Sequence, residues 1–296
     1  LWGVGSGKTY LLCSLSYQAK RRGLANRPII VVQKSTITQF IQSFQDLYPE
    51  AKLLRIDSDN FEQGICQIQS GNYDGIIMSH NSFYRIPVKE DTKIRQLQEE
   101  AEIIQQLLTE KEQEQGGIKN ELEQMAENLR LEMAELEIEK ELKVTPKEKM
   151  ESVIARFRKE YPNFRIKANG KITIKPLPKN QHKLKHEEVD QQKNYINKAI
   201  HSYASKNVPP WEELGIDCIL FDECHSLKNL KTPSKMGKIS GANLPSTERT
   251  INSLLKFRYT EEIRKGKLIW ATGTLPTNSL AESYVAQRFL SHDTLK

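Results

Sequence analysis

Short, uninterrupted apolar runs recur near both ends of the chain, and they constrain its fold more than any other feature. An apolar run without alternation is typical of a strand that is covered on both faces, as in a parallel sheet. Polar residues and then helical patterns follow these runs, as at 36–47 and 247–263. The runs lie at 29–32, 52–56, 76–78, 216–221 and 268–271. They predict an α/β fold with a doubly wound parallel sheet, whose ligands bind beyond the carboxyl ends of the strands.

Composition excludes several other classes of protein. The longest apolar runs hold four residues, whereas a membrane-spanning helix needs about 20. The apolar stretch of a signal peptide is also absent. The four cysteines, at positions 13, 66, 218 and 224, form no C-x-x-C pair, which argues against a zinc site or a disulfide framework. We therefore expect a reducing, cytoplasmic location.

Charge is distributed unevenly along the chain, whose formal net charge is +6. Residues 89–150 contain 10 basic and 17 acidic residues, whereas 151–210 contain 13 basic and 5 acidic residues. A polarised block of this kind indicates an insertion with its own role, such as contact with a polyanion. We therefore assign 1–88 and 211–296 to the parallel-sheet domain and 89–210 to an insertion.

The insertion begins with a coiled-coil pattern at 92–142. Apolar residues recur at spacings of three and four on both sides of Gly116-Gly117, which predicts two antiparallel helices. Thr145 and Pro146 then provide a cap and a first turn for another helix. This helix opens a basic helix and hairpin region at 146–200.

The hairpin at 164–175 has turn residues at Asn169-Gly170, and two registers are open to it. A two-residue loop would mix apolar and polar side chains on each face. A three-residue loop pairs Ile166 with Ile172 and Phe164 with Ile174, and we prefer it for that reason. The other face then carries Arg165, Lys167, Lys171 and Lys175. These four side chains would follow a phosphate backbone; the alternative is a solvated basic face neutralised by the acidic helices.

A glycine-rich turn opens the chain and leads directly into a predicted helix at 10–20. Residues 3–9 read G-V-G-S-G-K-T, and such glycines let backbone N–H groups converge on phosphate oxygens at a helix N-terminus. In this P-loop pattern Lys8 would reach the β- and γ-phosphates of ATP, and the Thr9 hydroxyl would hold Mg²⁺. The longer pattern asks for glycine where the chain has Trp2. A glycine-rich turn with an incidental lysine is therefore the alternative.

Two carboxylates, Asp222 and Glu223, follow the apolar run at 216–221. A carboxylate at the tip of a buried strand beside a P-loop is placed to bind Mg²⁺, and the next one can orient or deprotonate an attacking water. Acidic capping of a following helix is the alternative for this pair taken alone. We take Cys224 as a small packing residue and His225 as a polar coupling residue, because partner ligands at metal-binding spacing are lacking.

Five segments, at 4–10, 30–48, 73–87, 217–230 and 270–279, match in order the motifs of a known family. They resemble the first RecA-like domain of superfamily 2 helicases and translocases. More narrowly, the chain resembles the Swi/Snf-like ATPase module found beside adenine-specific DNA methylases in phage, plasmid and bacterial proteins. The matching segments cover most of 1–88 and 211–290, and five ordered motifs are more specific than any single one.

The resemblance implies a role for each matching residue. ATP would be bound by Gly5, Ser6, Gly7, Lys8 and Thr9. Lys8, Asp222 and Glu223 would act in catalysis, with Thr9 and Asp222 as ligands of Mg²⁺. Coupling of the nucleotide state to the nucleic acid would involve His225, Thr272, Gly273 and Thr274. Contacts to the nucleic-acid backbone would come from Lys34, Ser35, Thr36, Ser79, His80 and Asn81, although Ser35 and Thr36 could instead cap the following helix.

The resemblance also implies partners. They are DNA, which we expect to be double-stranded, and a second RecA-like domain in the same full-length chain. The strand that feeds the P-loop is missing from the sequence, so we expect a fragment, and whether a methylase domain follows is left open. The predicted function is ATP-dependent movement on DNA as a helicase or translocase. The alternatives are a restriction- or remodelling-type translocase without strand separation, and a non-catalytic remnant that binds DNA or a partner.

Overall fold

The chain divides into two units in the computed structural model, which describes residues 7–110, 117–166, 172–174, 208–227, 230, 247–273 and 280–290. Unit 1 consists of Leu1–Lys89 and Val208–Lys296, and unit 2 of Glu90–Asn207. Unit 2 corresponds to the segment that we assign to an insertion.

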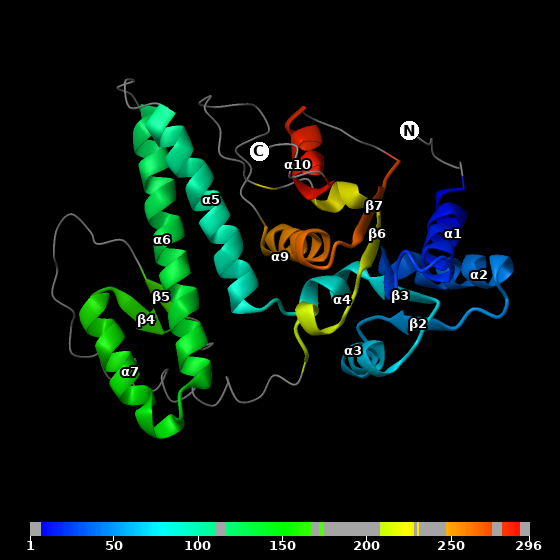
Figure 1. Cartoon of the computed structure of the whole chain (residues 1–296), viewed down its shortest axis with the longest axis horizontal. Helices are drawn as coiled ribbons and strands as arrows, with labels where there is room; N and C mark the ends of the chain where they lie inside the picture. The colour runs from blue at the N-terminus through cyan, green and yellow to red at the C-terminus, as the bar shows by residue number, and fades with distance from the viewer. Residues whose placement is uncertain are drawn as a thin grey trace. The chain divides into compact units, whose positions relative to one another are not determined.

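Unit 1 contains a five-stranded sheet with the strand order β2-β3-β1-β6-β7, and every neighbouring pair is parallel (Figure 1). The strands are β1 (Pro28–Val32), β2 (Leu53–Ile56), β3 (Gly75–Ser79), β6 (Cys218–Asp222) and β7 (Lys267–Ala271). All residues of β1, β3 and β6 are buried. The predicted α/β fold with a parallel sheet is therefore confirmed, for the reason that the apolar runs suggested: these strands are covered on both faces.

Alternate residues of each central strand enter two different cores. Ile30 and Val32 of β1 join the core formed with Leu12 of α1 and Phe40 of α2. Ile29 and its neighbours on the opposite face join the core formed with α3, α4, α9 and α10. The unit 1 helices are α1 (Lys8–Arg21), α2 (Ile37–Leu47), α3 (Phe61–Ser70), α4 (His80–Arg85), α9 (Glu248–Arg258) and α10 (Leu280–Leu290). The sheet is thus a central layer between two helical layers.

Most predicted elements of unit 1 differ from the structure by one or two residues at their ends, and two of them have a structural explanation. The strand expected at 216–221 is β6, Cys218–Asp222, because the Asp217 carboxylate accepts the backbone N–H groups of Asn26 and Arg27 just before the ladder begins. The helix expected at 247–263 is α9 followed by a π-helical turn, Tyr259–Ile263. Both elements exist, and the differences are confined to their boundaries.

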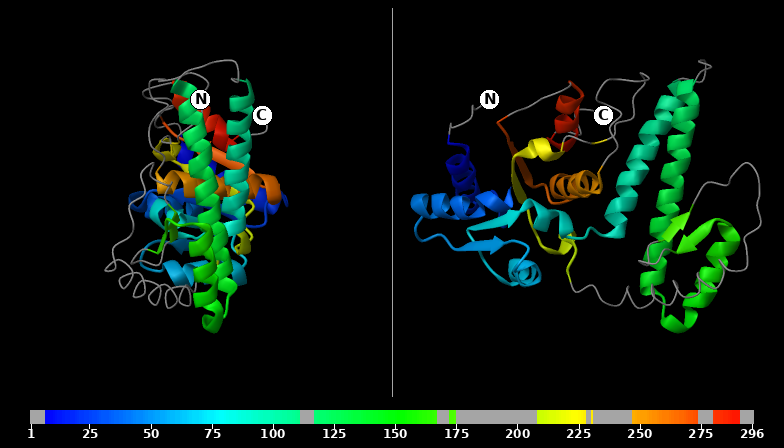
Figure 2. Two further views of the ribbon diagram at one scale, coloured as in Figure 1. Left: turned by 90° about the vertical axis from the view of Figure 1, so that its left-hand side faces the viewer. Right: turned by 180° about the vertical axis from the view of Figure 1, so that it is seen from behind.

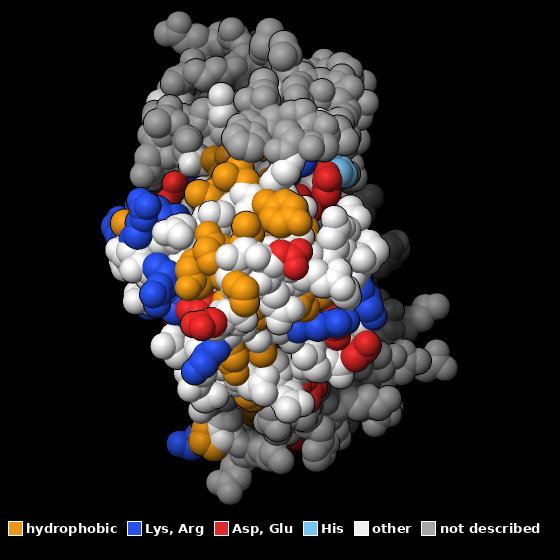
Figure 3. Space-filling view, turned by 90° about the vertical axis from the view of Figure 1, so that its right-hand side faces the viewer, with side chains coloured by type: hydrophobic (Ala, Val, Ile, Leu, Met, Phe, Trp, Pro, Cys, Tyr) orange, Lys and Arg blue, Asp and Glu red, His pale blue; other side chains and the backbone are white. Residues whose placement is uncertain are grey.

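Apolar side chains also reach the surface of unit 1. They gather among Lys and Arg side chains on the side of the molecule where α1 and α2 lie in Figure 1, and Figure 3 shows this face. The exposed large apolar residues of this helical layer include Tyr10, Leu15, Leu24 and Leu47. None of the helices in the described part of the chain is long and apolar enough to cross a membrane.

Unit 2 contains two long helices, α5 (Glu90–Glu110) and α6 (Gly117–Val144), which lie side by side in Figures 1 and 2. Ion pairs from Lys140 to Asp91 and from Lys143 to Glu90 join the end of α6 to the start of α5, so the two helices run antiparallel. Leu129 and Met133 of α6, two of the apolar residues that recur at the coiled-coil spacing, are only half-buried. Ala134, Ile138 and Leu142 of the same helix are buried instead, in a core shared with α7 (Lys147–Glu160) and the hairpin.

The hairpin strands of unit 2 are β4 (Phe164–Ile166) and β5 (Ile172–Ile174). Phe164 pairs with Ile174 and Ile166 with Ile172, the pairing that we prefer from the sequence, and all four side chains are buried. Carboxylates of α6 accept the free backbone N–H groups of β5: Glu135 Oε1 lies 2.5 Å from the nitrogen of Ile174. The edge of this short strand is therefore covered by acidic side chains.

One fully buried charge in unit 1 was not expected from the sequence. Lys256 of α9 has no exposed surface, and its amine donates a hydrogen bond to the Phe83 carbonyl oxygen. The Nζ atom lies 4.6 Å from the centre of the Phe83 ring and 5.7 Å from that of Trp211. Burial holds the pKa of this amine well below its usual value of 10.5.

Replacing Lys256 by methionine is expected to raise the free energy of unfolding at pH 7 by about 1–2 kcal/mol, because the apolar stem stays and the buried amine is removed. In the native chain the amine has a lowered pKa, so the folded state binds fewer protons than the unfolded state between that pKa and 10.5. The free energy of unfolding of the parent protein therefore rises with pH in this window. The difference in this free energy between Lys256→Met and the parent should shrink toward pH 10, and urea unfolding at several pH values measures this difference. Lys52→Met, at an exposed lysine, is the control, and an advantage that grows with pH would contradict the expectation.

Candidate functional site

The predicted site residues of unit 1 lie where parallel strands and the first helix present their ends to one edge of the sheet. β6 ends at Asp222, β7 ends at Ala271, and α1 begins at Lys8. In a parallel sheet with covering helices, the carboxyl ends of the strands and the N-termini of the following helices face the same side. Residues that are more than 200 positions apart in the chain are brought to one edge in this way.

The N-terminus of α1 begins directly after a left-handed glycine. Gly7 precedes the helix with φ = 80° and ψ = 25°, a left-handed conformation that glycine adopts without strain. The Gly7 carbonyl accepts the N–H of Leu11 at 3.0 Å, so the helical ladder starts at once. The first turn carries no acidic side chain, which leaves the positive end of the helix for a bound anion. Gly5 and Ser6 lie outside the described residues.

Asp222 is a nearly buried carboxylate with 9% of its surface exposed. Burial raises the pKa of Asp222 to about 6, and the neighbouring Glu223 charge adds to this effect. The backbone N–H of Glu223 and the charge of Lys8 act in the opposite direction. Lys8 is therefore close enough to interact with Asp222 electrostatically, and the fold brings these two predicted residues together.

The turn after Asp222 holds a second carboxylate in a strained backbone conformation. Glu223 has φ = 52°, which is uncommon for a residue with a side chain. Its Oε2 lies 2.9 Å from Nδ1 of His225, and the same Nδ1 lies 3.3 Å from the Thr272 hydroxyl. Thr272 follows directly after β7. A polar chain thus joins Glu223, His225 and Thr272 across the ends of two neighbouring strands, with Gly273 next along the backbone and Thr274 outside the described residues.

His80, the first residue of α4, packs against the turn that follows Asp222 and is half-buried there. Its Nε2 lies 2.9 Å from the Asp222 carbonyl oxygen, and its ring stacks on Phe221 with 4.7 Å between the ring centres. Burial lowers the pKa of His80. A carbonyl oxygen can only accept a hydrogen bond, so Nε2 of His80 is the donor. In the neutral imidazole the hydrogen is therefore on Nε2. The role of His80 in supporting Asp222 was not evident from the sequence, because the two residues are 142 positions apart.

Ser79 has an internal role as well. Its hydroxyl accepts the backbone N–H of Ser82 at 3.1 Å and so caps α4, and the side chain is buried. By contrast, Lys34 and Ser35 are exposed in a 3₁₀ turn, Lys34–Thr36, after β1. Lys34 Nζ lies 2.7 Å from the Ser58 hydroxyl. The Thr36 hydroxyl donates to the Gln33 carbonyl instead of capping α2.

The basic residues expected on the hairpin are part of unit 2. Arg165 is half-buried in β4. Lys167, Lys171 and Lys175 lie outside the described residues.

The donor set around Asp222 suits a magnesium ion bound together with phosphate. Within the ranges that the structure describes, three or more His, Cys, Asp or Glu side chains never gather into a metal site. Mg²⁺ does not need such a cage, because it is usually held by one or two protein oxygens, water and substrate phosphates. A cation beside Asp222 would also relieve the cost of placing two adjacent carboxylates at a buried strand end. Asp222 therefore fits this ion, and Thr9 lies in the first turn of α1.

Comparison with protein families gives a match over most of the chain. A family described as a probable helicase domain matches residues 2–154 and 167–296, which is nearly the whole chain. No curated protein and no solved structure matches the chain.

Proposed function

Since the chain belongs to the family of probable helicase domains, we propose that unit 1 is the ATP-binding motor domain of an ATP-dependent DNA helicase or translocase, with a RecA-like fold. The observation that carries this proposal is the meeting of Lys8, Asp222 and Glu223 at one edge of a parallel sheet, with Thr272 joined to Glu223 through His225. A nucleotide site alone would not require the link to Thr272.

Each residue has a distinct part in the proposed chemistry. Gly7 and the first N–H groups of α1 bind the phosphates of ATP, and Lys8 neutralises charge on them. Thr9 and Asp222 hold Mg²⁺, which supplies further neutralisation of phosphate charge. Glu223 orients the attacking water and accepts its proton. Because phosphoryl transfer depends mostly on positioning and charge, small shifts of Glu223 would change the rate strongly.

The hydrogen-bonded chain of Glu223, His225 and Thr272 connects the proposed catalytic site to the segment after β7. Nδ1 of His225 contacts both the Glu223 carboxylate and the Thr272 hydroxyl. A movement of the segment after β7 would therefore displace Glu223 and change hydrolysis. We propose DNA as the partner that drives this movement, and a second RecA-like domain of the full-length protein as the part that moves.

Lys8→Ala in the full-length protein is expected to weaken ATP binding about 10- to 100-fold, because the phosphates lose a charged hydrogen-bond donor. Titration with a fluorescent ATP analogue in the presence of Mg²⁺ measures the loss. Lys52→Ala removes an exposed lysine and should leave the affinity unchanged. Equal affinities for Lys8→Ala and the parent protein would exclude the assigned phosphate site.

A further inference from the structure

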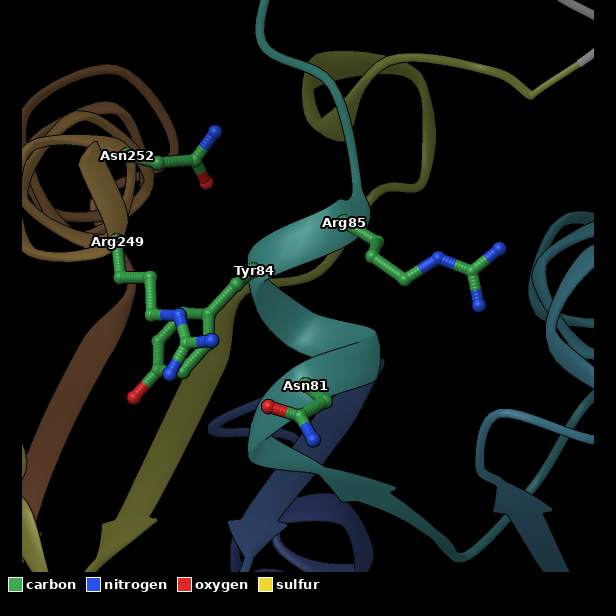
Figure 4. Close-up of a pocket in the computed structure, with 5 residues that line it drawn as sticks. All are labelled: Asn81, Tyr84, Arg85, Arg249 and Asn252. Atoms are coloured by element: carbon green, nitrogen blue, oxygen red, sulfur yellow. The ribbon is translucent and has the colours of Figure 1, made fainter.

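A polar pocket lies in unit 1 between α4 and α9, and its lining contains none of the residues to which we assign nucleotide binding. Its volume is about 370 Å³, within the range of sites that hold small ligands. Figure 4 shows the lining residues, of which Asn81, Tyr84 and Arg85 come from α4, and Arg249 and Asn252 from α9. Among the residues that the structure describes, no carboxylate lines this pocket. The guanidinium group of Arg249 and the two carboxamides are hydrogen-bond donors that suit an anion.

The two arginines of the pocket are held differently. Arg85 lies with its guanidinium 4.1 Å from the centre of the Phe61 ring, and Figure 4 shows it pointing away from Arg249. Arg249 extends over the Tyr84 ring at 5.8 Å, a looser contact, and it is exposed. Arg249 is therefore the cation that a ligand in the pocket would meet first.

Asn252 adds an unsatisfied polar group to the pocket. Its Oδ1 is buried without a hydrogen-bond partner. A buried polar atom without a partner costs free energy, and a ligand that pairs with it recovers that cost. The carboxamide of Asn252 can present either its oxygen or its NH₂ group, so it can also donate to a phosphate oxygen.

The helix that forms one wall of the pocket meets the catalytic turn at two points. The Tyr84 hydroxyl lies near the side chain of Ser226, which belongs to the 3₁₀ turn Cys224–Leu227. His80, the first residue of α4, is bonded to the Asp222 carbonyl oxygen. A ligand that shifts α4 would therefore move the turn that carries Glu223.

We propose that this pocket binds a phosphodiester group of a nucleic-acid strand, with Arg249 as its main charged contact, and that Tyr84 and His80 transmit its occupancy to the turn after Asp222. The transmission rests on the proposed ATPase function, whereas the binding does not. Tyr84 and His80 act as positioning residues in this scheme.

The binding is tested with the full chain and a fluorescein-labelled DNA oligonucleotide, single-stranded and as a duplex, over a range of salt concentrations without ATP. Arg249→Gln is expected to weaken binding about tenfold and to reduce the slope of log affinity against log salt by about one phosphate contact. Arg22→Gln removes an exposed arginine just after α1 and should leave the affinity nearly unchanged. An unchanged affinity and slope in Arg249→Gln, an equal loss in Arg22→Gln, or no binding of either oligonucleotide by the parent chain would overturn the proposal.

The transmission is tested with Tyr84→Phe in the full-length protein, since this change keeps the ring and removes only the hydroxyl that meets Ser226. We expect DNA binding to persist while the ratio of DNA-stimulated to basal ATP hydrolysis falls severalfold. An unchanged ratio would refute transmission through Tyr84. If the parent protein hydrolysed no ATP while Arg249→Gln still lost DNA affinity, the proposed motor function would fail and the pocket would stand.

Discussion

Asp222→Asn is expected to reduce ATP hydrolysis about 10²–10³-fold while much of the ATP affinity remains, because the carboxylate that we propose as a ligand of Mg²⁺ is lost. Lys8 and the N-terminus of α1 are unchanged in this variant and still bind the nucleotide. Phosphate release by the full-length protein measures the rate, and a fluorescent ATP analogue measures the affinity. Asp46→Asn, at an exposed aspartate of α2, is the matched control. Parental turnover in Asp222→Asn would remove Asp222 from the catalytic site.

The same carboxylate predicts a pH dependence. The pKa of Asp222 is raised to about 6, and only the ionised form binds a cation. The Mg²⁺ concentration that gives half-maximal hydrolysis should therefore rise as the pH falls through about 6, because protons and Mg²⁺ compete for this site. A magnesium requirement that is constant between pH 5 and pH 8 would contradict the assignment.

The ionised Asp222 carboxylate should lower the free energy of unfolding, although catalysis requires it. Its folded pKa lies above the ordinary value of 3.8, so the folded state binds more protons than the unfolded state between 3.8 and about 6. The free energy of unfolding therefore falls as pH rises through this window, and the charged group costs about 2–3 kcal/mol at pH 7 without Mg²⁺. Asp222→Asn should then unfold at a higher urea concentration than the parent at pH 7, although it is inactive.

Trp211→Ala is expected to lower the free energy of unfolding by about 3–5 kcal/mol, a large part of the stability of an ordinary domain. The side chain is 1% exposed and packs against Phe83 with 5.3 Å between the ring centres. Its Nε1–H donates to the Thr260 hydroxyl at 3.2 Å, and its backbone N–H donates to the Pro87 carbonyl at 2.8 Å. Trp211 thus anchors the chain where it re-enters unit 1 after unit 2.

A second tryptophan of unit 1 serves as the control for the hydrogen bond. Trp211→Phe keeps an aromatic ring but leaves the Thr260 hydroxyl without its indole donor. Trp270 is half-buried and its Nε1 has no hydrogen-bond partner, so Trp270→Phe should cost less than Trp211→Phe in urea unfolding. The reverse order would show that the bond to Thr260 contributes little to stability.

The parallel sheet could be predicted from the sequence because the pattern that identifies it is local. Runs such as 29–32 and 218–221 contain no polar alternation, so each strand must be covered on both faces. The boundaries were less predictable, since the start of β6 depends on Asp217 accepting N–H groups from residues about 190 positions earlier. In unit 2 the helical spacing was visible, but the choice of the buried side of α6 was not, because α7 and the hairpin compete with α5 for its apolar side chains.

By itself, the sequence determined which residue types could perform phosphate chemistry, since a glycine turn with Lys8 and Thr9 and the pair Asp222–Glu223 are patterns within a few consecutive residues. Only the tertiary structure decided pKa values, hydrogen-bond partners and burial. The raised pKa of Asp222, the support of its carbonyl by His80 and the burial of Lys256 beneath Phe83 all depend on neighbours from other strands and helices. Burial and electrostatic interaction act through space between segments that the fold brings together, and no local pattern records them.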